Sequence, residues 1–72
     1  MTAAMFIIDD AGMTTALTPA RAAELEVKVR SGYQGSIGAL RLERSHDGAV
    51  MLHGPYVVYV WADPDVLLEQ LP

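Results

Sequence analysis

The chain has 72 residues, no cysteine and a formal net charge of −4, with five lysines and arginines against nine aspartates and glutamates. This length predicts one domain over residues 1–72 with a single thin core, and a hydrophobic fraction of 51 % argues against intrinsic disorder. The lack of cysteine excludes disulfides, thiol catalysis and thiolate metal sites, and the few basic residues make nucleic-acid binding unlikely on electrostatic grounds.

The apolar N-terminal segment 1–8 lacks a basic flank and is followed by Asp9 and Asp10. It is too short for a signal peptide or a membrane-spanning helix, and no uncharged apolar run elsewhere reaches about 18 residues. We therefore expect a cytoplasmic protein without a membrane partner. The bias to alanine and to arginine over lysine, with no asparagine, is typical of a GC-rich bacterial or phage genome.

The first predicted element is a hairpin. Residues 5–8 form a short β-prone run, Asp10-Ala11-Gly12 is a turn signal, and residues 13–17 return as a second strand. Thr18-Pro19 then has the pattern of a helix N-cap followed by proline at the first helical position.

Residues 19–31 have two interpretations. Pairs of opposite charge four residues apart and Gly32 at the end favour a helix over 19–31. Residues 24–30 alternate polar and apolar without a fault, which would place Leu25, Val27 and Val29 on one face of a strand. Because Glu26 and Arg30 would fall within the apolar arc of a helix, we predict one helical turn at 19–23 and a strand at 24–30.

The second half of the chain predicts three strands and a helix. The strands are expected at 39–44, 49–53 and 56–61, with an Asp47-Gly48 hairpin turn and a Gly54-Pro55 turn between them. Asp63-Pro64 then begins a terminal helix of about two turns. The predicted fold class is mainly β, a small antiparallel sheet or SH3-like barrel with a short C-terminal helix. The alternative is an α+β fold with a helix at 19–31.

Glycines at 32, 35 and 38 raise the possibility of a phosphate-binding loop. The spacing G-x-x-G-x-x-G differs from the dinucleotide fingerprint, a strand rather than a helix follows, and the Walker lysine is missing. The G-x-x-G of KH domains joins two helices and carries basic residues, and this segment does neither. We therefore interpret residues 32–38 as a tight loop rather than a ligand site.

Candidate catalytic and metal-binding residues are sparse. The two histidines, His46 and His53, have no metal-ligand spacing, and only Ser45 has a histidine beside it in sequence. Asp9 and Asp10 diverge if their segment is extended. We predict a non-enzyme with no cofactor and no metal.

The most distinctive feature is the segment 48–62, which contains no charged residue other than histidine. On a strand at 56–61 both faces would be apolar, and a chain this small can bury only one of them in its own core. The second face must be covered by the terminal helix, by another copy or by another protein. Tyrosine and tryptophan are enriched at interaction hot spots. The predicted interface residues are Tyr33, Met51, Tyr56, Tyr59 and Trp61.

One family resemblance covers residues 24–71. Val27-Lys28-Val29-Arg30 followed by the glycine-punctuated segment 32–40 resembles the opening of a KOW-type, SH3-like small barrel. Such domains often pair a basic-hydrophobic strand with a glycine-rich loop ahead of the second strand. Ribosomal and transcription members are richer in basic residues, so the resemblance implies a barrel that binds protein rather than RNA. Residues 1–23 lie outside it.

The sequence therefore predicts a non-enzymatic protein–protein interaction module, a bacterial or phage inhibitor or adaptor that binds a larger partner or a second copy of itself. The alternative is a nucleic-acid-binding small barrel. That function would use the basic residues Lys28, Arg30, Arg41 and Arg44, which the alternation interleaves with glutamates that neutralise them.

Overall fold

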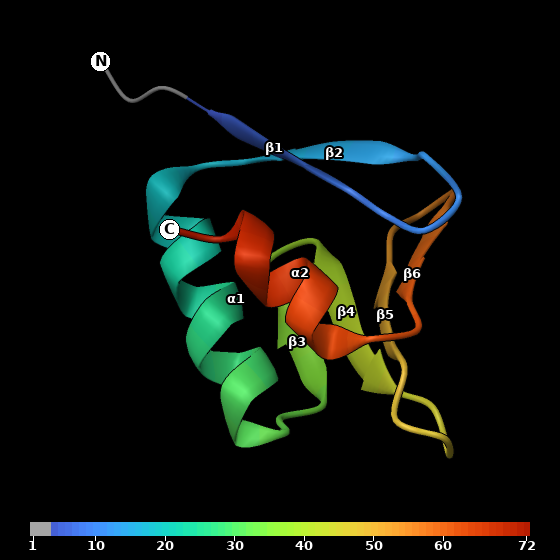
Figure 1. The fold of residues 1–72 in the computed structure, drawn as a ribbon. Helices are drawn as coiled ribbons and strands as arrows, with labels where there is room; N and C mark the ends of the chain where they lie inside the picture. Colours follow the sequence, from blue (N-terminus) through green and yellow to red (C-terminus); the bar gives the residue numbers. More distant parts are fainter. Residues whose placement is uncertain (1–3) are drawn as a thin grey trace.

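The computed structural model describes residues 4–72, which form six strands and two helices. In chain order these are β1 (Met5–Ile8), β2 (Thr14–Leu17), α1 (Pro19–Ser31), β3 (Gly35–Ile37), β4 (Leu40–Arg44), β5 (Val50–His53), β6 (Val58–Trp61) and α2 (Pro64–Gln70). Strands β1 and β2 pair as an antiparallel hairpin, and β3 to β6 form a four-stranded antiparallel sheet in sequential order. The protein is thus a small α+β fold (Figure 1).

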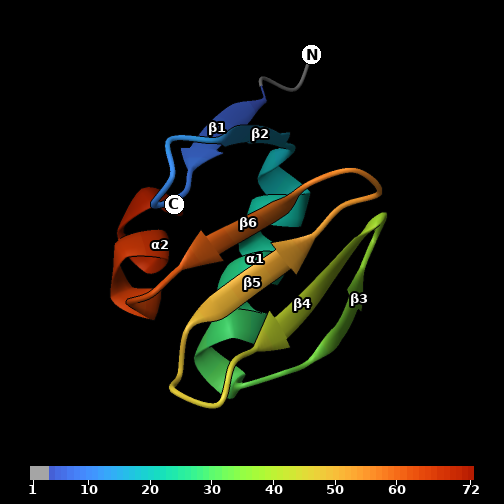
Figure 2. The same ribbon diagram turned by 90° about the vertical axis from the view of Figure 1, so that its right-hand side faces the viewer.

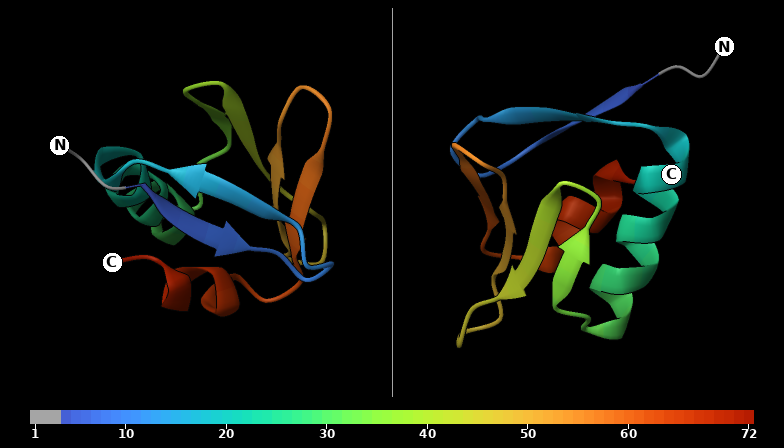
Figure 3. Two further views of the ribbon diagram at one scale, coloured as in Figure 1. Left: turned by 90° about the horizontal axis from the view of Figure 1, so that it is seen from above. Right: turned by 180° about the vertical axis from the view of Figure 1, so that it is seen from behind.

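Both helices lie on one face of the four-stranded sheet, and the β1–β2 hairpin lies across one end of this arrangement (Figures 1 and 2). Seen from above, α2 runs beside the hairpin and α1 lies behind it (Figure 3). The core fills the space between these layers. Its members are Ile7, Leu17, Ala22, Leu25, Val29, Ile37, Leu42, Val50, Leu52, Tyr59, Trp61, Leu67 and Leu71.

The strand predicted at 24–30 is wrong, because the whole of 19–31 is helical as in the alternative fold class. The helix begins after Thr18, whose hydroxyl accepts a hydrogen bond from the Arg21 N–H, and Pro19 occupies the first turn. It ends at Gly32, which adopts a left-handed conformation with φ 74° that glycine tolerates without strain. These end signals outweighed the alternating pattern between them.

The burial pattern of α1 explains why the alternation of polar and apolar residues wrongly predicted a strand. Only Ala22, Leu25 and Val29 are buried, which is the spacing of a narrow helical stripe. Val27, which the alternation placed beside Leu25 and Val29, is 66 % exposed. A helix that needs only three buried positions can carry a valine on its solvent side, and that valine produced the apparent period of two.

Several predicted elements are confirmed. The hairpin of β1 and β2 turns at residues 9–13, and the Asp47-Gly48 turn joins β4 to β5. The terminal helix α2 begins after Asp63, whose carboxylate accepts from the Asp65 N–H. The glycine-rich loop contains the short strand β3, which the sequence did not predict as a strand.

The expected barrel is not present. Within residues 4–72 the four-stranded sheet is open, with β3 at one edge and β6 at the other, and no strand closes it. Helix α1 occupies the part of the chain that the KOW-type resemblance assigned to the first barrel strand. Over the same residues no helix combines the length and the apolar character needed to traverse a bilayer.

Candidate protein-binding surface

One face of the four-stranded sheet is turned away from the helices (Figure 2). The register aligns Met51 opposite Val60, and His53 opposite Val58, so these four side chains share that outer face. On the neighbouring strand β4, Glu43 lies opposite Met51 and shares the same face. The outer face is therefore polar toward β4 and apolar toward β6.

The apolar half has four members, which we call the outer-face patch: Met51, Tyr56, Val58 and Val60. Tyr56, in the turn that leads into β6, is 97 % exposed, Val58 is 43 % exposed and Val60 is 37 % exposed. Met51 is half-buried. Single exposed apolar residues are ordinary on protein surfaces, but here three lie at neighbouring positions of two paired strands and a fourth lies in the turn before one of them.

The polar half is organised by Glu43. Its carboxylate accepts from Arg41 Nε at 3.1 Å, and its second oxygen lies 3.3 Å from His53 Nε2. The second contact has the distance of an ion pair but not the geometry of a hydrogen bond, since His53 Nε2 has no hydrogen-bond partner among the described residues. Glu43 thus orients the two nitrogen-bearing side chains that border the outer-face patch.

Two of the predicted interface residues are in the core. Trp61 is fully buried, and its Nε1–H donates to the Ile8 carbonyl at 2.9 Å, while Tyr59 is 8 % exposed. Both point from β6 toward the helices, on the opposite face of the strand from Val58 and Val60. We therefore remove Trp61 and Tyr59 from the contact surface, because a side chain buried in the monomer cannot reach a partner.

Tyr33 lies apart from the other predicted interface residues. It follows α1 and stands next to β3, at the opposite edge of the sheet from β6. Lys28 Nζ sits 4.3 Å from the centre of its ring, and the Tyr33 hydroxyl donates to the Ser36 carbonyl at 3.4 Å. The ring also covers Gly35, where an added Cβ would lie 2.6 Å from the hydroxyl oxygen. Tyr33 therefore packs on its own loop, away from the patch.

The structure thus brings together only Met51 and Tyr56 of the five predicted interface residues. Val58 and Val60, which complete the outer-face patch, were left out because aromatic side chains were preferred as contact residues. The alternation of side chains along β6 could have identified them. If Trp61 faces the core, Val58 and Val60 must lie on the opposite face of the strand.

Asp9 and Asp10, considered above only as a catalytic pair, close the outer edge of β6. The Asp9 carboxylate accepts from the Val60 N–H at 3.0 Å and from the N–H groups of Met13 at 2.8 Å and Ala11 at 3.0 Å. The Asp10 N–H donates to the Val60 carbonyl, and the Asp10 carboxylate accepts from Ala62. The β1–β2 turn therefore supplies β6 with hydrogen bonds that a fifth strand would otherwise make.

These hydrogen bonds also set the charge state of Asp9. Burial by itself raises the pKa of this carboxyl, but the backbone N–H groups, led by that of Val60, stabilise the ionised form and the net effect is a pKa below the ordinary value. Asp9 is only 7 % exposed. It is therefore a buried anion held by backbone dipoles rather than by a cation.

Ser45, the serine beside a histidine, is engaged in the β4–β5 turn. Its hydroxyl donates to the Asp47 carboxylate and accepts from the Ala49 N–H. Neither contact involves His46. The hydroxyl stabilises the hairpin turn, and nothing in this arrangement activates it as a nucleophile.

Each of the five basic side chains has a partner within residues 4–72. Ion pairs join Arg21 and Lys28 to Glu24, Arg30 to Glu26 and Arg41 to Glu43. The remaining one, Arg44, donates to the Val29 carbonyl near the end of α1.

Comparison with known proteins finds no matching family model, no matching curated protein and no matching solved structure.

Proposed function

We propose that the protein is a non-enzymatic interaction module, a bacterial or phage inhibitor or adaptor, that binds a larger protein partner through the outer-face patch. The observation that supports this function best is Tyr56, which is 97 % exposed in the turn that leads into β6. A tyrosine buries a large area on binding at low cost in side-chain entropy, and its hydroxyl can still find a hydrogen-bond partner.

The capped edge of β6 favours contact through side chains. The backbone of Val60 is occupied by Asp9 and Asp10, so a partner strand cannot extend the sheet along this part of β6. The side chains of Val58 and Val60 remain accessible on the outer face. The partner is therefore expected to lay a surface across β5 and β6 rather than add a strand.

An interface of ordinary size would take a sizeable part of the surface of this small chain. A specific interface buries roughly 800 Å² on each partner, about a fifth of the 4393 Å² of accessible surface of this chain. The polar residues Arg41, Glu43 and His53 border the patch on one side, which resembles the polar rim around an apolar interface centre.

Nucleic-acid binding receives no support from the charges. Release of counterions from phosphates requires basic groups that are free to pair with them, and the ion pairs with Glu24, Glu26 and Glu43 neutralise most of those present. The net charge of −4 opposes approach to a polyanion. We therefore do not carry the nucleic-acid alternative further.

The test is affinity capture from bacterial lysate, followed by purification of the captured protein and measurement of its Kd. The variants are Tyr56→Ala and Val58→Glu, with Val66→Glu as the matched control. Val66 is 42 % exposed on α2, almost the same as the 43 % of Val58, and it lies outside the outer-face patch. We expect both patch variants to weaken binding at least tenfold and the control to bind like the wild type.

Two outcomes would contradict the proposal. A partner that binds all three variants equally would show that the patch is not the contact surface. A concentration-independent homodimer in light scattering that Val58→Glu converts to a monomer would show that a second copy occupies the patch.

A further inference from the structure

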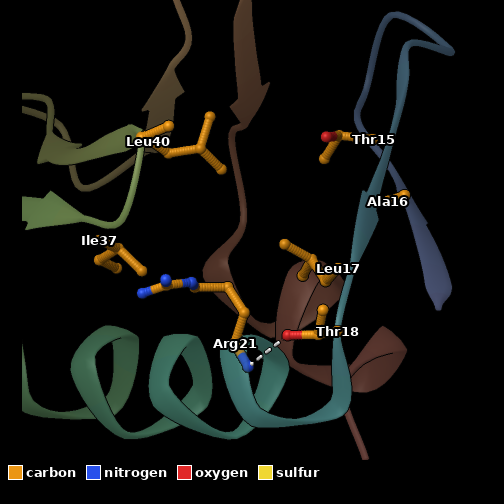
Figure 4. A pocket seen from close by; sticks show the side chains of 8 residues that line it. Thr15, Ala16, Leu17, Thr18, Arg21, Ile37 and Leu40 are labelled. Carbon is orange, nitrogen blue, oxygen red and sulfur yellow. Dashed lines mark hydrogen bonds between the residues drawn. The ribbon is translucent and has the colours of Figure 1, made fainter. Parts of the chain in front are cut away.

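A groove of about 340 Å³ lies between β2 and the β3–β4 turn, and no residue of the outer-face patch lines it (Figure 4). Strand β2 forms one wall with residues 15–18, and Ile37, Ala39 and Leu40 form the other. The side chain of Arg21, from the first turns of α1, extends between the two walls (Figure 4). The groove therefore joins the consecutive elements β2 and α1 to the β3–β4 turn, which comes later in the chain.

Strand β2 lines this groove with the side chains of Thr15 and Leu17, while the side chain of Ala16 points away from it (Figure 4). The outer edge of the same strand has open backbone groups. In the hairpin the Asp9 N–H donates to the Met13 carbonyl. Every second residue of β1 counted back from Asp9, and the residue opposite each of them in β2, therefore directs its N–H and C=O toward the other strand. Ile8 lies between two such residues, so its backbone N–H and C=O point away from β2 and hydrogen-bond with the Gln70 side chain. By the same alternation the N–H and C=O of Ala16, opposite Phe6, point away from β1, and within residues 4–72 they have no hydrogen-bond partner.

The β2 edge differs from two other strand edges of this protein. The outer edge of β1 is closed by Gln70, and that of β6 is closed by Asp9 and Asp10. Both closures use side chains that imitate a neighbouring strand. Among residues 4–72 no such side chain closes β2 at Ala16, which is one of the residues that line the groove. An extended peptide that runs along β2 can satisfy this unpaired donor and acceptor.

The side chains of the groove indicate the composition of that peptide. The exposed Ala39 and the half-buried Leu40 provide apolar contact for alternate residues, above the buried Leu17 and Ile37. Arg21 provides charge, because its partner Glu24 is shared with Lys28 and the three groups together retain one positive charge. The matching ligand has alternating apolar side chains and one carboxylate.

The position of Arg21 is restricted by its surroundings. Its Nη1 lies 2.5 Å from Glu24 Oε1. Its guanidinium also lies against Gly38, where an added Cβ would be 2.7 Å from the guanidinium carbon. Because a side chain at position 38 would displace it, the glycine allows Arg21 to reach the groove wall. Five donors in a fixed plane suit the recognition of a carboxylate.

We propose that this groove binds an extended segment of a second protein, which pairs with β2 as an added strand and directs an aspartate or glutamate side chain to Arg21. The proposal is independent of the proposed function, because it uses a different surface. It gives the protein a second contact, made by main-chain hydrogen bonds rather than by an apolar face.

The test begins with selection of binders from a library of random twelve-residue peptides displayed on phage. We expect enrichment of peptides with alternating apolar residues and one acidic residue.

The binding variant is Ala16→Pro, which removes the outward N–H at an exposed position of an edge strand, where proline is tolerated. Ala16→Val keeps the N–H and serves as the matched control. Binding should fall about tenfold or more in Ala16→Pro and change little in Ala16→Val.

The role of Arg21 has its own test. In wild type, replacing the acidic residue of a selected peptide by its amide should weaken binding about tenfold, and in Arg21→Gln the same replacement should have little effect. Equal losses in both proteins would refute the carboxylate contact with Arg21.

Amide chemical shifts of the labelled protein keep the proposal testable if Ala16→Pro does not fold. Shifts at residues 14–18 and 37–40 on addition of the peptide would support the groove. Failure to select any peptide, or shifts confined to Met51, Tyr56, Val58 and Val60, would overturn it. The second result would leave the proposed function intact and show that peptides bind the outer-face patch instead.

Discussion

At the scale of single residues, Asp9 shows how a carboxylate can be stabilised without a cation. Three backbone N–H groups bind it, and its pKa is lowered although burial acts in the opposite direction. Because the folded pKa lies below the unfolded one, Asp9 stabilises the fold fully above about pH 4, and this stabilisation is lost as the pH falls through the folded pKa.

We predict that Asp9→Asn lowers the free energy of unfolding by about 1–3 kcal/mol at pH 7, since an amide cannot replace an anion that accepts three hydrogen bonds. Urea unfolding at pH 7 and at about pH 3 measures this, and the difference between variant and wild type should shrink at the lower pH. Glu69→Gln, at an exposed position, is the control and should stay within about 0.5 kcal/mol of wild type. An Asp9→Asn protein as stable as wild type at pH 7 would contradict this account.

Trp61 is the only tryptophan in the chain, so it reports on its own burial. We predict blue-shifted fluorescence emission that iodide quenches only after unfolding. Trp61→Ala should cost about 3–5 kcal/mol, enough to unfold so small a domain, because it leaves a cavity and removes the hydrogen bond to Ile8. Native emission that iodide quenches freely would place the indole at the surface, where the sequence pattern had assigned it.

At the scale of elements, α1 is the place where sequence and structure diverge most. Its residues 24–30 alternate as a strand does, yet the N-cap at Thr18, the proline after it and the left-handed Gly32 define a helix. Alternation and helical spacing agree on Leu25 and Val29 and differ on Val27. The exposed fraction of Val27 therefore decides between the two structures.

A pair of substitutions tests this difference. Val27→Gln should change the free energy of unfolding by less than about 0.5 kcal/mol, since the side chain is exposed and glutamine is a good helix former. Val29→Gln should cost several kcal/mol, on the order of 2–4, because it places an unpaired amide in the core. Thermal unfolding followed by circular dichroism compares the two. Similar losses in both variants would support the strand instead of the helix.

At the scale of the whole molecule, side chains control which surfaces are open to other proteins. Gln70 closes β1, Asp9 and Asp10 close β6, and glutamates pair with most of the basic residues. Among the surfaces that residues 4–72 leave open are the outer-face patch and the groove beside β2. The molecule thus combines capped strand edges, which oppose uncontrolled sheet extension, with two defined places for contact.

We predict that the double variant Asp10→Ala, Gln70→Ala associates with itself while the wild type remains monomeric. The first change frees the Ala62 N–H just beyond β6, and the second frees the Ile8 N–H on the outer edge of β1. Light scattering over about a hundredfold range of concentration should show a rising mass for the double variant only, with Glu69→Ala as the control. A double variant that is folded by circular dichroism and monomeric throughout would show that these caps do not restrain association.

The elements whose signals are local could be predicted from the sequence: the β1–β2 hairpin, the Asp47-Gly48 turn, the meander strands and the helix after Asp63. Turn chemistry and caps act within a few residues, so neighbours in sequence are sufficient to specify them. The charge-free segment 48–62 also correctly indicated a strand with two apolar faces. Which face becomes the core is different, because it depends on the helices that pack against the sheet.

That choice belongs to the tertiary structure. Trp61 and Val60 are neighbours in a strand that is apolar on both sides, and only the position of α1 and α2 buries the tryptophan and leaves the valine outside. The closure of β6 by Asp9 and the groove beside Ala16 likewise join residues separated by most of the chain. Local sequence patterns determined where strands and turns form. Packing between distant segments decided which side chains are buried, which strand edges are closed and which surfaces stay open, because only the assembled layers remove that area from water.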